Sequence, residues 1–241
     1  MNTRCALAAL LALAACREAP SDESVPFRVL PPSPPCENCT LDAPTVATRP
    51  LPLLVVLHGN NETASVAAAR WKDVAIERGF VVLGLHCPRT EGCEDGKWYR
   101  WESTPGWIKQ QVNEVVHAMP IDRTRIFAAG WSGGATALGM HAQRLDRMFA
   151  AVVFHGGGQP PLGTDECPAQ QMPAYFLVGD QNPAHPAAQR LRAYYLRCAQ
   201  ELTWDLLPGA NHAREDKALD REKASRIIDW LEDHARQRNV S

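Results

Sequence analysis

Three residues of this chain could together carry out nucleophilic catalysis, and their order along the chain is that of a known catalytic triad. Ser132 lies in Gly130-Trp131-Ser132-Gly133-Gly134, Asp180 follows Val178-Gly179, and His212 follows Gly209-Ala210-Asn211. A serine hydroxyl becomes a strong nucleophile when a histidine removes its proton, and a carboxylate orients that histidine. The order serine, acid, histidine is one of the known solutions. We therefore expect Ser132 to be the nucleophile, His212 the base and Asp180 the acid.

The segment around Ser132 predicts how the hydroxyl is presented. The apolar run Ile126–Ala129 indicates a strand, and the glycines after it indicate a tight turn into a helix. Gly130 and Gly134 flank the serine by two residues, where the turn leaves space only for a small residue. The same string also occurs in ordinary turns, so the strand and the helix carry the argument.

Alternatives remain open for the acid and the base. Asp180 suits a turn as well as a triad, because Asp-Gln-Asn-Pro favours a turn and a helix start. His212 could be an ordinary histidine of a surface loop. Asp205 is the reserve acid, although its position inside a strand can direct it away from the site.

The oxyanion that forms during acyl transfer needs two backbone donors. One is expected from the amide of Gly133, the residue after the nucleophile, and the other from the loop after the strand 53–57. That loop reads Leu57-His58-Gly59-Asn60-Asn61, and the amide of Asn60 is the expected donor. His58 is expected to be structural.

Short apolar runs alternate with helical patterns along most of the chain, which predicts an α/β fold of one domain. The sheet is expected to be mostly parallel with helices on both faces, and its crevice lies at the carboxyl ends of the strands. The expected strands are 53–57, 80–85, 125–129, 150–154, 174–178 and 202–207, and the expected helices are 63–78, 108–119, 133–144, 186–199 and 218–237.

The first residues predict export. Residues 1–15 combine Arg4 with a short apolar run, which is typical of a signal peptide. The run ends in Leu13-Ala14-Ala15-Cys16, which resembles a bacterial lipobox and predicts lipidation of Cys16 and a membrane as partner. A plain signal peptide and a secreted protein are the alternative. We expect a lipidated, proline-rich tether with a small cysteine segment over 16–49, and the catalytic domain over 50–241.

The net charge and the cysteines indicate which partners, disulfides and metal sites to expect. The net charge is −2 without a basic block, so nucleic acid is not an expected partner. The cysteines beyond Cys16 predict three disulfides. Cys87 and Cys93 bracket a short loop, Cys167 and Cys198 lie at one edge of the sheet, and Cys36 and Cys39 close a small loop. The alternative for the last pair is a redox site. No zinc spacing occurs, so no metal or other cofactor is expected.

Taken together, the motifs at His58-Gly59, Ser132, Gly179-Asp180 and His212 resemble the α/β-hydrolase superfamily over about residues 50–235. The chain is most similar to small secreted esterases of the polyhydroxybutyrate depolymerase and feruloyl esterase kind. The resemblance implies a serine esterase of the cell envelope acting on a small or oligomeric ester. Those relatives often carry Ser-Ala-Gly-Gly where this chain has Ser132-Gly133-Gly134-Ala135. The alternatives are a peptidase of the prolyl-oligopeptidase type and a non-catalytic binding protein.

Only two long loops, 87–106 and 155–173, could cover the site, so we expect no large lid and an open, shallow site. Aromatic rings near the crevice could bind an acyl or phenolic group. The candidates are Trp98, Trp101, Trp131 and His155, and the alternative for Trp98, Trp101 and His155 is a structural role.

Overall fold

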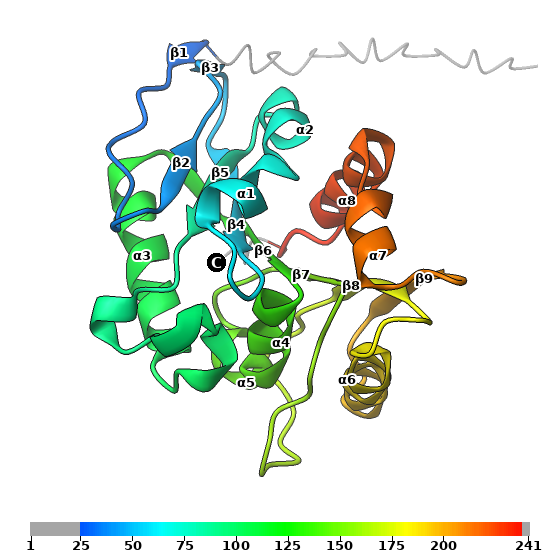
Figure 1. Cartoon of the computed structure of the whole chain (residues 1–241). Coiled ribbons are helices and arrows are strands. Elements are labelled where there is room, and N and C mark those ends of the chain that lie inside the picture. The colour runs from blue at the N-terminus through cyan, green and yellow to red at the C-terminus, as the bar shows by residue number, and fades with distance from the viewer. Residues whose placement is uncertain (1–24, 238–241) are drawn as a thin grey trace, which may run out of the picture.

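The computed structural model describes residues 25–237. Its centre is a sheet in the order β2-β5-β4-β6-β7-β8-β9, parallel except for the antiparallel edge strand β2 (Figure 1). The strands of this sheet are β2 (Thr40–Asp42), β4 (Leu51–Leu57), β5 (Val81–Leu85), β6 (Ile121–Trp131), β7 (Val152–His155), β8 (Ala174–Gly179) and β9 (Leu202–Leu207). The predicted α/β fold is confirmed.

Helices cover both faces of the sheet (Figure 1). They are α1 (Ala64–Ala69), α2 (Lys72–Glu77), α3 (Thr104–Ala118), α4 (Gly133–Met140), α5 (Ala142–Leu145), α6 (His185–Arg197), α7 (His212–Ala218) and α8 (Arg221–Asp233). A separate two-stranded ribbon pairs β1 (Phe27–Arg28) with β3 (Val46–Ala47).

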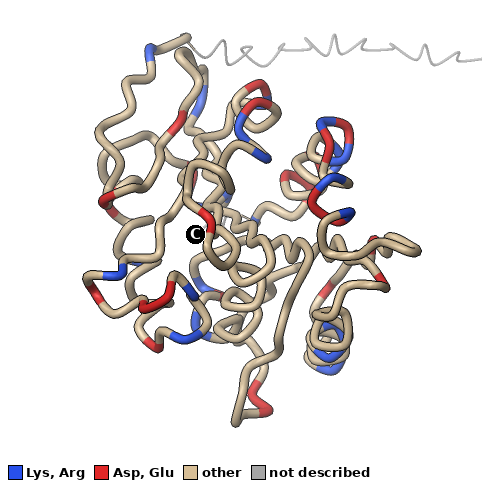
Figure 2. Tube along the Cα trace, in the orientation of Figure 1, with Lys and Arg blue, Asp and Glu red and all other residues tan. Residues whose placement is uncertain are grey.

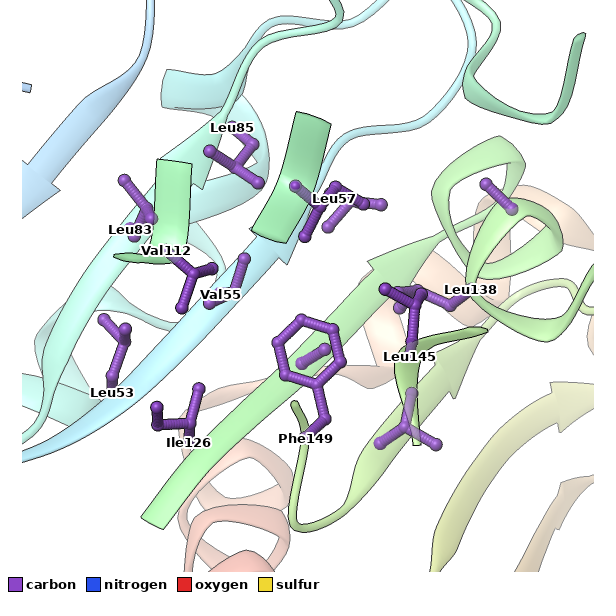
Figure 3. Close-up of a cluster of buried hydrophobic side chains, with 14 of the residues drawn as sticks. Leu53, Val55, Leu57, Leu83, Leu85, Val112, Ile126, Leu138, Leu145 and Phe149 are labelled. Carbon is purple, nitrogen blue, oxygen red and sulfur yellow. The ribbon is translucent and has the colours of Figure 1, made fainter. Parts of the chain in front are cut away.

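Alternation along the central strands divides the core between the two faces. Leu53, Val55 and Leu57 of β4 belong to one apolar cluster with residues of α3 and α4 (Figure 3) and of α6. Leu54 and Val56 belong to the cluster formed with α1, α2 and α8. Because both faces of these strands are buried, the strands read as continuous apolar runs. Most Lys, Arg, Asp and Glu residues lie on the outer helices and loops, with both signs mixed (Figure 2).

Several element boundaries differ from the sequence prediction. The helix expected over 63–78 is two helices that break around Arg70 and Trp71, and the one expected over 133–144 breaks at His141. The helix expected over 218–237 is α8, and the sequence prediction did not include α7, which begins at His212. The long loop contains three short 3₁₀ turns (Arg89–Glu91, Glu94–Gly96 and Trp98–Arg100) before α3 begins. The sheet also starts ahead of residue 50, because β2 belongs to it.

The three predicted disulfides are all formed. They join Cys36 to Cys39, Cys87 to Cys93, and Cys167 to Cys198. Such bonds persist in oxidising compartments, so they are consistent with an extracellular protein. The predicted signal peptide and Cys16 lie outside the described residues. Among residues 25–237, none of the helices is long and apolar enough to cross a bilayer.

Candidate active site

Ser132 stands at the point where β6 ends and α4 begins. Its backbone angles are φ 50° and ψ −106°, a region that residues other than glycine rarely occupy. A Cβ on Gly130 would come within 2.5 Å of the Ala135 nitrogen, and one on Gly134 within 2.5 Å of the Leu57 carbonyl oxygen. These contacts explain both glycines, and the structure has the strained turn that the sequence indicates.

Gly133 and Asn60, the two expected oxyanion donors, lie against each other. A Cβ on Gly133 would overlap Oδ1 of Asn60 and would lie 3.3 Å from its backbone nitrogen. The Asn60 side chain donates a hydrogen bond of 3.2 Å from Nδ2 to the Tyr99 hydroxyl. The structure therefore brings the loop after β4, the first residue of α4 and the turn Trp98–Arg100 to one place.

His212, the expected base, is the first residue of α7. Its ring stacks on Trp131, the residue before the nucleophile, with centroids 4.4 Å apart and planes 5° from parallel. Trp131 is itself packed against the His155 ring and lies beneath the guanidinium of Arg70, 5.1 Å from its ring centroid. Trp131 is thus a spacer that places the His212 ring beside the nucleophile turn.

The structure does not bring Asp180, the expected acid, to the ring of His212. The Asp180 carboxylate is exposed and accepts a hydrogen bond of 2.7 Å from the Gly209 amide, which ties it to the turn before His212 rather than to the ring. Nδ1 of His212 lies 3.1 Å from Oε2 of Glu215, one turn further along α7. The reserve acid Asp205 is also directed elsewhere, since it accepts hydrogen bonds from Tyr175 and Lys223.

Arg70 connects the two halves of the site. Its guanidinium binds Glu62 at 2.6 Å and Asp216 of α7 at 2.7 Å. Oε2 of the same Glu62 accepts a hydrogen bond of 3.0 Å from the Gly59 amide. The loop that carries Asn60 is therefore fixed to the helix that carries His212.

The candidate substrate residues do not form one binding surface. Trp98 has no exposed surface and packs against Trp107, so it holds the loop onto the domain and cannot contact a substrate. Trp101 is half-buried against the same ring. Trp131 is only 7% exposed and serves His212, as described above.

Two buried histidines near the site are structural. Burial lowers the pKa of His155 to about 4, although its ring is hydrogen-bonded through Nε2 to the Glu215 carbonyl. Burial also lowers the pKa of His58. His58 bonds the Gly59 carbonyl through Nδ1 and accepts from the Cys87 amide through Nε2, so both ring nitrogens are used. Neither ring is a base for Ser132.

Sequence reasoning missed Glu215 and Asn182. The signal for Glu215 was its spacing, since residues three apart on a helix lie on one face. That signal is readable only if the helix begins at His212, where Asn211 provides the N-cap by accepting from the Arg214 amide. Asn182 is brought to the site by tertiary packing that no local pattern shows.

The model of the dienelactone hydrolase family matches residues 98–234, more than half of the chain and the stretch that holds Ser132 and His212. The chain belongs to the dienelactone hydrolase family. It is therefore a hydrolase on an α/β-hydrolase fold. No curated protein sequence matches this family member significantly.

Solved structures share the fold at low sequence identity. A thermostable esterase matches with a TM-score of 0.67 and 18% identity over 82% of this chain, which spans 59% of that esterase. A fluorophosphonate-binding serine hydrolase of Staphylococcus aureus matches at 0.62 and 16%, covering 80% of this chain and 91% of that one. Est1E of Butyrivibrio proteoclasticus, solved with ferulic acid, matches at 0.59 and 16%, covering 81% and 95%.

Proposed function

We propose that this member of the dienelactone hydrolase family is a serine carboxylic ester hydrolase that works through an acyl-enzyme. The observation that carries the proposal is Ser132, held at φ 50° on the turn between β6 and α4 while the adjacent Trp131 stacks on His212. Backbone strain that the surrounding packing maintains is a mark of functional sites.

The residues divide the reaction between them. Oγ of Ser132 attacks the ester carbonyl carbon while its proton passes to Nε2 of His212, and the amides of Asn60 and Gly133 stabilise the resulting oxyanion. The carbon–alkoxy bond then breaks, and the leaving alcohol takes the proton from Nε2. Water repeats the sequence on the acyl-serine, giving the acid and free Ser132. Losing one oxyanion donor costs about 3 kcal/mol of transition-state stabilisation in such sites.

Short-acyl and hydroxycinnamoyl esters are the proposed substrates. Ser132 is half-buried rather than enclosed, as a shallow site requires. The ferulic acid in the Butyrivibrio structure and the sequence resemblance to feruloyl and polyhydroxybutyrate esterases support the same class. The resemblance to a lipobox supports a lipid anchor on Cys16, with the cell envelope as location and the membrane as partner.

The test is loss of activity and of covalent labelling in Ser132→Ala. The wild-type protein should hydrolyse short p-nitrophenyl esters and take up a fluorophosphonate on Ser132. The variant should lose at least about 10³-fold in kcat/KM and all labelling. The exposed Ser33→Ala is the matched control. Equal hydrolysis by Ser132→Ala would overturn the mechanism, and a wild-type protein without adduct would favour a non-catalytic binding role.

A further inference from the structure

Glu215 is the buried carboxylate of this site. Its residue is 0% exposed, although its backbone belongs to the first turn of a surface helix. Three donors surround it: the Gly179 amide on Oε1, and the Asn182 side chain and His212 Nδ1 on Oε2. A carboxylate buried to this extent is stable when each oxygen is hydrogen-bonded. The carboxylate that lies at the end of β8 therefore comes from α7 and not from the loop that follows β8.

The orientation of the Asn182 amide is fixed. Oδ1 of Asn182 accepts from the Ala184 amide at 2.9 Å, which identifies the other terminal atom as the nitrogen. The two hydrogens of that nitrogen go to the Gly156 carbonyl at 3.1 Å and to Oε2 of Glu215. An amide nitrogen has two hydrogens, so none is left for His212.

This assignment decides the tautomer of His212. Nδ1 lies 3.1 Å from the Asn182 nitrogen and 3.1 Å from Oε2 of Glu215. With both amide hydrogens used, Nδ1 receives no hydrogen from Asn182, and an ionised carboxylate only accepts. The neutral ring therefore carries its proton on Nδ1 and donates it to Glu215. Nε2 keeps its lone pair, which is the state that can accept the proton of Ser132.

The residue type at 182 also has a reason. The Asn182 nitrogen touches the Glu215 carboxylate, so an aspartate at this position would place two carboxylates in one buried space. Like charges so close cannot both ionise, and one of them would hold a proton. A neutral amide instead donates a hydrogen bond to Glu215 and adds no second carboxylate beside His212.

We infer that Glu215 is the positioning residue that holds His212 in its proton-accepting tautomer, with Asn182 supporting the carboxylate, and that neither Asp180 nor Asp205 has this role. The inference rests on the proposed function, and it names the third member of a Ser132-His212-Glu215 triad in which the base and its acid share one helix turn.

The first experiment compares Glu215→Gln with Asp180→Asn. A glutamine at 215 can donate as well as accept, which permits the wrong tautomer of His212. We expect kcat/KM to fall about 10³- to 10⁴-fold, mainly in kcat, as when a triad carboxylate becomes an amide. Asp180→Asn should stay within a few-fold of wild type. The reverse ranking, with Glu215→Gln nearly as active as wild type, would overturn the inference.

A second variant moves the acid instead of removing it. In Asn182→Asp with Glu215→Gln, the new carboxylate can accept from His212 Nδ1 once it has turned away from the Gly156 carbonyl, to which the amide nitrogen donated. The charge count is that of the wild type. We expect at least tenfold higher kcat/KM than Glu215→Gln alone. Asn182→Asp alone should be slower than wild type. A double variant no faster than the single Glu215→Gln would count against a role in orienting His212.

The third measurement does not depend on activity. Long-range ¹H–¹⁵N spectra of the wild-type protein at neutral pH, with His212 assigned by comparison with His212→Gln, should show Nδ1 protonated and Nε2 free. A ring protonated on Nε2 would overturn the inference even if the enzyme is active. The expected spectrum in a protein without esterase activity would instead keep the assignment and reject the proposed function.

Discussion

Asn60 explains the residue that follows the nucleophile. Its side chain occupies the space that a Cβ at position 133 would need, so this position has to be glycine. The relatives that the sequence resembles often have alanine there. The difference in the motif is therefore a local consequence of the Asn60 side chain, which also bonds Tyr99.

Gly133→Ala should lower kcat/KM about 10²-fold. The new methyl group displaces the Asn60 loop or the turn at Ser132, and a displacement of about 1 Å in an active site costs about this factor. Asn60→Ala removes the overlapping atoms and keeps the backbone donor. Alanine at 133 should consequently cost much less in the Asn60→Ala background. Steady-state kinetics of the four proteins gives the coupling, and an equal effect of Gly133→Ala in both backgrounds would contradict this explanation.

Single residues were predictable from sequence where the local backbone dictates them. Ser132, Gly130 and Gly134 are fixed by the geometry of one turn, and the structure reproduces that turn. The acid could not be read in the same way. Asp180 follows a strand at the expected place, but its side chain accepts from the Gly209 amide. The spacing of Glu215 from His212 becomes informative only when the start of α7 is known.

At the scale of elements, the seven-residue helix α7 carries two residues of the site, His212 and Glu215. It presents His212 and Glu215 on one face because residues three apart on a helix are neighbours. Its start depends on Asn211, whose side chain accepts a hydrogen bond of 3.1 Å from the Arg214 amide. The helix cap is therefore also a support for the base.

Asn211→Ala should lower the free energy of unfolding by about 1 kcal/mol through loss of the cap, and also lower kcat because the first turn frays. Asp220→Ala is the matched control, since Asp220 caps α8 in the same way at 2.8 Å from the Lys223 amide. It should show a similar thermal shift with kcat unchanged. If both variants lose kcat equally, the effect is one of general stability.

The strands were easier to predict from the sequence than the helices were. The parallel strands are buried on both faces, so their continuous apolar runs are strong signals. The helices were harder, because periodicity continues across breaks such as the one at Arg70 and Trp71, where side chains turn to pair with other segments. The start of α7 was missed because its cap follows directly on a loop glycine and alanine.

At the scale of the whole molecule, two histidines are buried where protonation of the ring is unfavourable. Burial lowers the pKa of His155 and of His141 to about 4, against an ordinary value of 6.5. A group whose pKa is lower in the folded state contributes stability at pH values above its unfolded pKa. That contribution is lost as pH falls from 6.5 toward 4, because the unfolded chain then binds protons that the folded chain does not.

Urea unfolding should thus show a loss of about 2 kcal/mol for each of these two histidines between pH 8 and pH 5. His141→Gln should remove its share of the pH dependence, whereas the exposed His117→Gln should leave the dependence intact. A free energy of unfolding that is the same at pH 8 and pH 5 would contradict the burial of neutral rings.

The shared helix turn of His212 and Glu215 also affects how such a site can be inherited. A base and an acid on separate loops can be lost one at a time, by an insertion or a crossover between them. Here residues 211–215 encode the cap, the base and the carboxylate as one short cassette. The loop after β8 then has to supply only a neutral donor, Asn182.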